Sequence, residues 1–242
     1  MSQGDRQARH RESPGGSPGV VSSSTPPKEL EVICIVDVGL GNVGAVRSML
    51  YRIGAESVTT ADPAAIASAD RLILPGVGAF DAAVTRLTEH GLVPVLHARV
   101  RDAGVPILGI CLGMQLLSRR SEEGTLPGLG WIAADTVRFR FSDGERALPV
   151  PHMGWNTLTV RRPVGPLKDL DPESRFYFVH SYHVRCDREE DVMATARYGM
   201  DFHAAVARDN VFGVQFHPEK SHRFGMSLLR TFAAAGQSDE RV

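Results

Sequence analysis

Cysteine is scarce in this chain, with only Cys34, Cys111 and Cys186 among 242 residues. This number and spacing exclude a disulfide framework or a cysteine-rich zinc site. The net charge of −1 leaves no basic surplus for nucleic acid. No apolar run approaches the roughly 18 residues that span a bilayer. These absences predict no metal, no nucleic-acid partner and no membrane partner, and they favour a reducing, cytoplasmic location.

Aromatic residues are missing from the first 30 positions, which contain the run SPGGSPGVVSSSTPPKE. A segment rich in Ser, Gly and Pro buries too little apolar surface to offset the entropy of ordering it. It also lacks the apolar core of a signal peptide. An organelle transit peptide, suggested by the Arg and Ser content, is the alternative. We therefore predict a disordered tail over residues 1–30 and a single domain over residues 31–236.

The rest of the chain contains a repeated pattern of apolar strand, glycine turn and amphipathic helix. It begins with EVICIVDV at residues 31–38 and recurs in RLILPGVGAF and in PILGICLGMQLLSRR. After about residue 130, short strand-like runs replace this pattern, and a last helix is expected over residues 222–235. One or two helices, interrupted near Gly91 and Pro94, are expected over residues 81–103. The pattern predicts a doubly wound α/β fold, with a mostly parallel sheet and extra β structure in the second half.

Two glycines flank one cysteine at a spacing that predicts a nucleophile. Gly109-Ile110-Cys111-Leu112-Gly113 follows an apolar strand pattern and opens a helical one. This spacing is typical of a nucleophile elbow, a strained turn that tolerates only small residues two positions away. The turn pushes the sulfur out over the end of the sheet, and the positive end of the helix favours the thiolate. The alternative is a buried structural cysteine, which is the interpretation we give to Cys34 and Cys186.

A cysteine nucleophile needs a base, and the base needs a group that orients it. His217 is the leading candidate, because Gln215-Phe216-His217-Pro218-Glu219 follows the strand-like run VFGVQF. Residues two apart lie on the same side of an extended chain, so Glu219 is predicted to orient His217. His180 and His152 are the competing bases, and His180 could equally line the pocket as a binding residue.

These motifs together resemble a known enzyme family. GICLGMQLL with GVQFHPEKS resembles the class I glutamine amidotransferases, and LILPGVGAF, LPVPHMGWN, FYFVHSYHV and FHAAV resemble the glutaminase subunit of imidazole glycerol phosphate synthase. The resemblance covers about residues 31–235. It implies a flavodoxin-like sheet, hydrolysis of L-glutamine to glutamate and ammonia, and no cofactor. It also implies a heterodimer with a (β/α)8 cyclase that uses the ammonia to make imidazole glycerol phosphate and AICAR in histidine biosynthesis.

Residue roles follow from this resemblance position by position. Cys111 is similar to the nucleophile that forms a glutamyl thioester, His217 to the general base and acid, and Glu219 to its orienting group. The resemblance implies an oxyanion hole from the N–H groups of Val77 and Leu112, with a peptide flip in Gly76-Val77-Gly78. It further implies substrate binding by Gly76, Gly78, Gln115, Glu123, Ser181 and Tyr182, and a partner interface at Asn42, Trp155 and Lys220, close to residues 152–156.

Some features depart from the pattern and leave alternatives open. Asp37-Val38-Gly39 stands where the family usually has an aromatic second residue, which affects partner-facing contacts. FVHSYHV and EKSHRFGM also resemble a paralogous branch that supplies ammonia for surface-sugar biosynthesis on a sugar nucleotide. A stand-alone thiol hydrolase and a non-enzymatic binding module are the alternatives from other classes. Gln115 and Glu123 argue against the first, and the intact Cys, His and Glu set argues against the second.

Overall fold

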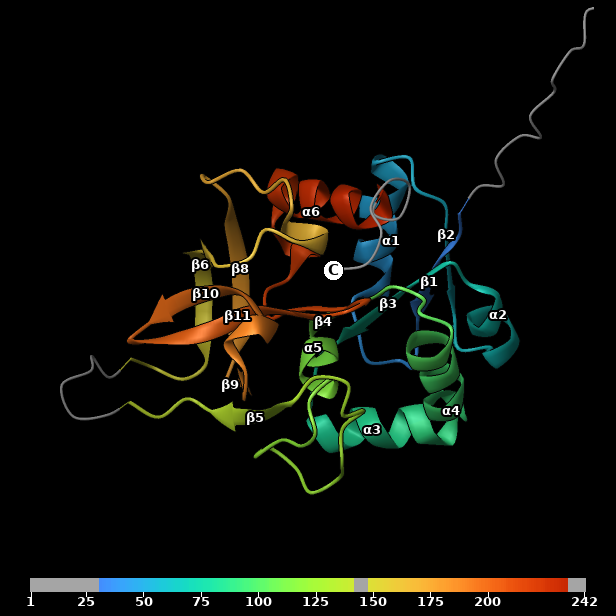
Figure 1. Cartoon of the computed structure of the whole chain (residues 1–242), viewed down its shortest axis with the longest axis horizontal. Helices are drawn as coiled ribbons and strands as arrows, with labels where there is room; N and C mark the ends of the chain where they lie inside the picture. Colours follow the sequence, from blue (N-terminus) through green and yellow to red (C-terminus); the bar gives the residue numbers. More distant parts are fainter. Residues whose placement is uncertain (1–30, 142–147, 235–242) are drawn as a thin grey trace, which may run out of the picture.

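The computed structural model describes residues 31–141 and 148–234 (Figure 1). The predicted tail over residues 1–30 lies outside the described residues, as do positions 235 and 236 of the predicted domain. Within the described ranges, no helix combines the length and the apolar character that a membrane span requires.

A parallel sheet forms the centre of the fold, in the strand order of flavodoxin-like proteins. The order is β2, β1, β3, β4 and β12, and each neighbouring pair is parallel. Every strand except β2 is buried along its whole length, because helices cover both faces. The bounds are β1 (Ile33–Val36), β2 (Ser57–Thr60), β3 (Arg71–Gly76), β4 (Ile107–Cys111) and β12 (Val211–Val214). The predicted doubly wound α/β fold is confirmed.

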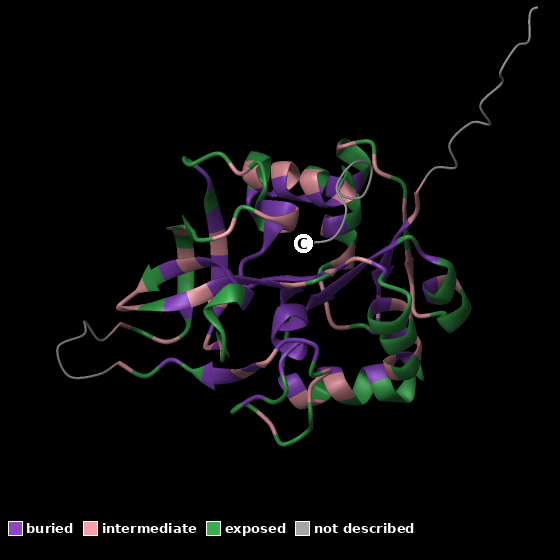
Figure 2. Cartoon of the chain, in the orientation of Figure 1, coloured by how far each residue is buried: buried purple, intermediate pink, exposed green. Residues whose placement is uncertain are grey.

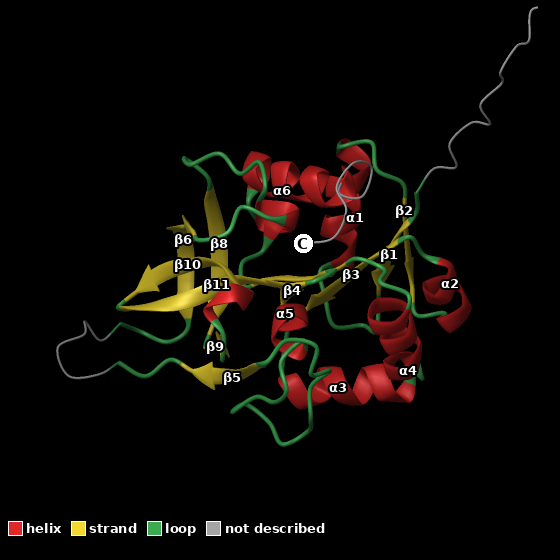
Figure 3. Cartoon of the chain, in the orientation of Figure 1, coloured by secondary structure: helices red, strands yellow, loops and turns green. Residues whose placement is uncertain are grey.

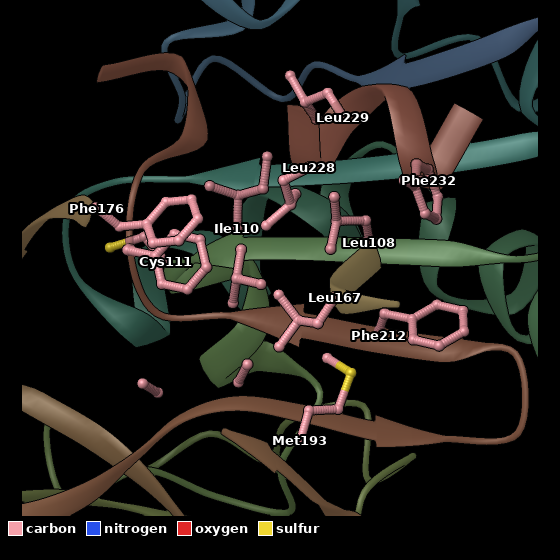
Figure 4. Close-up of a cluster of buried hydrophobic side chains, with 14 of the residues drawn as sticks. Leu108, Ile110, Cys111, Leu167, Phe176, Met193, Phe212, Leu228, Leu229 and Phe232 are labelled. Atoms are coloured by element: carbon pink, nitrogen blue, oxygen red, sulfur yellow. The ribbon is translucent and has the colours of Figure 1, made fainter. Parts of the chain in front are cut away.

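Helices lie on both faces of this sheet, and each face has its own hydrophobic core. Figure 2 shows the buried strands between the two layers. On one face are α1 (Val43–Arg52) and α6 (His222–Ala234); on the other are α2 (Pro63–Ser68), α3 (Phe80–Glu89) and α4 (Leu92–His97), followed by the π-helical turn Ala98–Asp102. The core under α1 and α6 includes Cys111, as Figure 4 shows, so this cysteine lies at the end of a closely packed layer.

The second half of the chain adds antiparallel strands beyond β12, as predicted (Figure 3). β11 pairs with β12, β10 and β9; β9 also pairs with β5, and β7 pairs with β10. A separate two-stranded sheet joins β6 and β8. The bounds are β5 (Ala134–Arg138), β6 (His152–Thr157), β7 (Thr159–Val160), β8 (Arg175–His180), β9 (Tyr182–Cys186), β10 (Val192–Tyr198) and β11 (Met200–Arg208), with 3-10 turns at Gly165–Leu167, Glu189–Asp191 and Pro218–Lys220.

Three local expectations differ from the structure. The strand β2 and the helix α2 had no counterpart in the sequence pattern, because SVTT is an edge strand with no buried apolar run. Pro94 does not interrupt a helix, since it occupies the first turn of α4, where its missing N–H costs nothing. The break falls at Gly91, whose φ of 65° is the left-handed conformation that glycine adopts readily.

Candidate active site

Cys111 occupies a strained backbone position at the junction of β4 and α5 (Leu112–Leu116). Its φ of 54° and ψ of −108° lie outside the regions that side-chain-bearing residues normally occupy. Such strain persists only where the surrounding structure enforces it, and it is concentrated at functional positions. Because α5 spans only five residues, the positive end of a helix contributes less here than the sequence pattern suggested.

Steric contacts explain why glycines flank this cysteine. A Cβ on Gly113 would lie 1.7 Å from the Leu74 carbonyl oxygen of β3. A Cβ on Gly109 would lie 2.7 Å from the backbone of Gly113. Neither position has space for a larger residue, because β4 turns back so tightly that α5 lies against β3. The small residues of the elbow are therefore a packing requirement of the turn itself.

His217 and Glu219 form a buried pair beside the elbow. His217 Nδ1 lies 2.7 Å from Glu219 Oε1, and both side chains are at most 3% exposed. Two hydrogen bonds of the His217 backbone fix its position. The His217 N–H donates to the Tyr177 carbonyl of β8, and the His217 carbonyl accepts from the Ser221 hydroxyl.

The geometry of this pair differs from the extended arrangement expected from sequence. β12 ends at Val214, three residues before His217, and Pro218–Lys220 form a 3-10 turn. Glu219 therefore approaches His217 by curling back in a tight turn, and not by alternation along a strand. The expected contact exists, but the expected extended geometry was wrong, because a 3-10 turn that begins at Pro218 brings the two side chains together.

The electrostatics of the pair favour a charged imidazole. Burial disfavours the imidazolium, but the Cys111 thiol and the Glu219 carboxylate outweigh that effect and raise the pKa of His217 to about 9. His217 Nε2 and Glu219 Oε2 are buried without a hydrogen-bond partner among the described residues. Unpaired buried polar atoms are uncommon and concentrate where a reaction uses them. Glu219 also lines a cavity of about 360 Å³ between α1 and α6.

The loop expected to complete an oxyanion hole lies directly beside the nucleophile candidate. Gly76, the last residue of β3, is paired in register with Cys111. Gly78 has a φ of 101°, which only glycine adopts without strain. The Val77 N–H donates to the Leu40 carbonyl at 3.0 Å. In this conformation the Val77 N–H therefore serves the fold, and it is not available to an oxyanion beside Cys111.

Two residues expected to bind substrate have definite partners in the structure. The Gln115 side chain is buried and donates from Nε2 to the Tyr182 carbonyl at 3.1 Å. Glu123 Oε2 accepts the Phe80 N–H at 2.9 Å, at the start of α3 and two residues after Gly78. Glu123 is therefore fixed near the glycine loop by a backbone contact.

Comparison with known proteins decides the family. The family model for class I glutamine amidotransferases matches residues 34–235. The chain belongs to the class I glutamine amidotransferase family. It is 48% identical, over 83% of this chain and 98% of the relative, to a protein of Methanococcus maripaludis named imidazole glycerol phosphate synthase subunit HisH 2. A protein of the same name from Pseudomonas aeruginosa is 49% identical over the same shares, and the subunit HisH of Bdellovibrio bacteriovorus is 46% identical over 84% and 99%.

Solved structures of this amidotransferase family share the fold at low sequence identity. A structure titled glutamine amidotransferase matches with a TM-score of 0.62 and 20% identity, covering 84% of this chain and 96% of that one. A glutamine amidotransferase from Thermotoga maritima matches with a TM-score of 0.60 and 14% identity, covering 85% and 97%. Agreement at such low identity concerns the architecture alone.

The segment between β8 and β9 borders the amidotransferase site through its backbone. The Ser181 carbonyl accepts the Phe139 N–H, and the Tyr182 carbonyl accepts from Gln115 and from His180 Nδ1, the latter at 2.8 Å. The Tyr182 ring is partly exposed, and its hydroxyl accepts from Arg138. The backbone of this segment is thus already engaged with the residues around Cys111.

The three residues expected at a partner interface all lie on the surface. Trp155 is 48% exposed and stacks on His222 at 5.6 Å, so it does not belong to the core. The Lys220 ammonium lies over the Tyr177 ring. Asn42 is exposed at the start of α1, where its side chain makes no capping hydrogen bond.

Sequence reasoning gave no role to Gln215, which the structure places against the nucleophile candidate. Gln215 is fully buried, and its Nε2 lies 3.7 Å from Cys111 Sγ. The sequence signal that could have identified Gln215 is a polar residue inside the apolar run VFGVQF.

The competing bases, His152 and His180, hydrogen-bond to each other at 3.1 Å. Within the described residues, no group of His, Cys, Asp and Glu is arranged to hold a metal ion.

Proposed function

We propose that this chain is the glutaminase subunit of imidazole glycerol phosphate synthase in histidine biosynthesis. The observation that carries the proposal is the strained Cys111 elbow beside the buried His217–Glu219 pair. Membership of the class I amidotransferase family and 46–49% identity to proteins named HisH supply the reaction and the pathway. L-Glutamine is then the substrate, and glutamate and ammonia are the products.

The chemistry follows from the three side chains. The Cys111 thiolate attacks the carboxamide carbon of glutamine, and His217 donates a proton to the leaving nitrogen, which departs as ammonia. A glutamyl thioester remains on the sulfur. His217 then takes a proton from water, the hydroxide attacks the thioester carbon, and the C–S bond breaks to release glutamate. Glu219 orients the ring by accepting from Nδ1, which directs Nε2 toward the reaction.

The oxyanion of each tetrahedral intermediate would be held by the N–H groups of Leu112 and Val77. Leu112 is the first residue of α5, directly after the nucleophile. The Val77 N–H donates to Leu40 in this conformation, so the Gly76–Val77 peptide must rotate before it contributes. The glycines at positions 76 and 78 make that rotation sterically inexpensive.

The same proposal assigns substrate binding to the residues around this loop. Glu123 offers its carboxylate to the substrate ammonium, and Gln115 contacts the same amino-acid head group. Gly76, Gly78, Ser181 and Tyr182 contribute backbone surface beside the sulfur. The placement of Glu123 against Phe80, at the end of the glycine loop, supports this assignment.

The proposed partner is a (β/α)8 cyclase that forms a heterodimer with this chain and receives the ammonia. Asn42, Trp155 and Lys220 are the proposed contacts, and their exposure on the surface supports that role. A cytoplasmic location stays a prediction, made because a nucleophilic thiol needs a reducing compartment.

The test uses the purified chain with and without its cognate cyclase. We expect glutamine hydrolysis and glutamine-dependent cyclase turnover in the complex. Cys111→Ala should lower both by at least about 10³-fold, since covalent catalysis is removed. Ammonia-dependent cyclase turnover should persist, because free ammonia bypasses this subunit. Glutamine hydrolysis that survives in the Ala variant would contradict the assignment of the nucleophile.

A second candidate differs only in the acceptor pathway. The run EKSHRFGM resembles the branch that supplies ammonia for surface-sugar biosynthesis, and its His222 stacks on the exposed Trp155 at the proposed interface. The chain should be expressed in a cell that lacks its own histidine-pathway glutaminase subunit and carries the cognate cyclase. Growth without histidine at low ammonia supports the histidine pathway. Absent growth, with glutaminase activity beside a sugar-modifying partner, supports the second candidate.

A further inference from the structure

A chain of buried hydrogen bonds connects the two-stranded sheet β6–β8 to the sulfur of Cys111. It runs from His152 through His180 to the Tyr182 carbonyl, and from that carbonyl through Gln115 and Gln215 to the sulfur. All four side chains that form it are buried. Inside a protein such a network is strong only if each donor meets an acceptor, so the direction of every bond matters.

The Tyr182 carbonyl determines that direction, because a carbonyl oxygen can only accept. Gln115 must therefore turn its NH₂ group toward it, at 3.1 Å. The same Nε2 lies 3.2 Å from Gln215 Oε1, which makes that oxygen an acceptor. The remaining NH₂ group of Gln215 consequently faces Cys111 Sγ at 3.7 Å. The sulfur meets a donor, whereas the reversed amide would present an oxygen to it.

The part of the network from His152 through His180 to the Tyr182 carbonyl, here called the histidine arm, is directed by the same carbonyl acceptor. His180 Nδ1 must carry the proton that it donates to the Tyr182 carbonyl at 2.8 Å. Burial lowers the pKa of His180 well below its usual value, so the ring is neutral and its Nε2 is an acceptor. His152 then donates from Nδ1 to His180 Nε2 at 3.1 Å. Burial lowers the pKa of His152 to about 4, so this ring is neutral as well.

We propose that the Gln215 amide stabilises the Cys111 thiolate by donating to its sulfur, and that Gln115, the Tyr182 carbonyl and His180 are positioning residues that hold this amide in the donating orientation. A donor to an ionised acceptor strengthens when the charge forms, so the contact favours the reactive state of the sulfur. The inference rests on the proposed role of Cys111 as nucleophile. β6 carries both His152 and Trp155, so the chain of hydrogen bonds also links the proposed partner-facing strand to the sulfur.

The experiment measures the thiol itself, so that it does not depend on glutamine turnover. Iodoacetamide alkylation of the full chain is followed from pH 5 to pH 10, with Cys111→Ala as the blank. Burial raises the pKa of Cys34 to about 11 and that of Cys186 to about 12, so both stay unreactive near pH 7. Among the described residues, His217, with Glu219 behind it, is the titratable side chain that acts on Cys111. His152, His183 and His217 are the titratable side chains that act on His180.

Gln215→Leu should slow alkylation at pH 7 by about tenfold and move its pH midpoint upward, because the sulfur loses a donor. Gln215→Glu keeps the shape of the side chain and replaces the donor by an acceptor, so it should also slow the reaction. If either variant fails to fold, as judged by circular dichroism, the other decides. A folded variant that alkylates at the wild-type rate across the pH range would overturn the proposal.

The positioning role is tested by a matched pair of histidines. His180 and His183 are both buried and both pack against Phe139 and Phe202. Among the described residues, the His183 ring hydrogen-bonds only to the Val184 carbonyl, at 3.4 Å, so it lies outside the chain of hydrogen bonds that leads to the sulfur. His180→Phe should slow alkylation about threefold, and His183→Phe should leave it unchanged. Equal rates in the two variants would overturn the histidine arm. If the variants slow alkylation as expected but the wild-type chain with its cyclase shows no glutaminase activity, the result counts against the proposed function and not against this contact.

Discussion

Val77 donates its backbone N–H to the carbonyl oxygen of Leu40 at 3.0 Å, one residue after the position that pairs in register with Cys111. The loop after β1 therefore occupies the donor that the proposed oxyanion hole requires. With substrate bound beside the sulfur as proposed, a structure that keeps this bond offers one donor fewer to the transition state.

We expect the isolated chain to be a poor glutaminase for this reason. Loss of one oxyanion donor lowers kcat by about 10²-fold to 10³-fold. Addition of the cyclase and its acceptor-site ligand should restore that factor, which is a coupling between two sites. Steady-state glutamine hydrolysis with and without the partner measures it. Full activity from the isolated chain would mean that the Val77 peptide does not need to rotate.

The pH dependence of stability should report the charge of His217. Its pKa is raised to about 9 in the folded chain, against about 6.5 when unfolded. The stabilisation is therefore fully present below about pH 6.5 and is lost as the pH rises through about 9. Glu219→Gln removes one of the groups that raise this pKa, so the variant should lose less stability over that range. Urea unfolding at pH 6 and pH 9.5 tests the difference, and equal losses in both proteins would contradict it.

The glycine at position 113 should be irreplaceable for steric reasons. Gly113→Ala places a Cβ 1.7 Å from the Leu74 carbonyl oxygen, and we expect a loss of about 3 kcal/mol in unfolding free energy. Gly44→Ala is the matched control, because a Cβ there meets nothing within 4 Å and the residue lies inside α1. The control should gain about 0.5 to 1 kcal/mol. Denaturant titration of both variants measures the change in unfolding free energy. A loss in Gly113→Ala alone attributes the effect to the clash, whereas equal changes in the two variants would contradict it.

Trp155 should contribute to binding the cyclase without contributing to stability. It is 48% exposed on β6, and exposed tryptophans at interfaces are frequent binding hot spots. Trp155→Ala should raise the Kd for the cyclase by at least about tenfold. Tyr51→Ala is the control, since Tyr51 is 83% exposed near the other end of α1 from Asn42. Titration calorimetry separates the two variants, and similar affinities would place the interface elsewhere.

Deletion of residues 2–28 should leave the melting temperature and glutaminase activity unchanged. The segment contains no pattern that forms a core. Thermal unfolding of the full chain and of the truncated chain measures this. A clear fall in melting temperature on deletion would show that the segment packs on the domain.

Local chemistry explains which parts of the site the sequence predicted. The Gly109-x-Cys111-x-Gly113 spacing identifies the elbow because the clash that requires glycine arises within one tight turn and the strand beside it. His217 and Glu219 were paired correctly because they are two residues apart, although a 3-10 turn and not a strand brings them together. The edge strand β2 was missed because SVTT carries no apolar signal.

By itself, the sequence determined the strand–turn–helix units, the Gly109-x-Cys111-x-Gly113 motif and the His217–Glu219 pair, since each is recognised from residues near one another in the chain. Only the tertiary structure decided what surrounds the sulfur. Gln115 meets Gln215 across 100 positions and the Tyr182 carbonyl across 67. No local pattern encodes those contacts, because they exist only after β4, β9 and β12 converge in one fold. The same holds for the bond between Val77 and Leu40, which depends on how the loop after β1 packs against the end of β3.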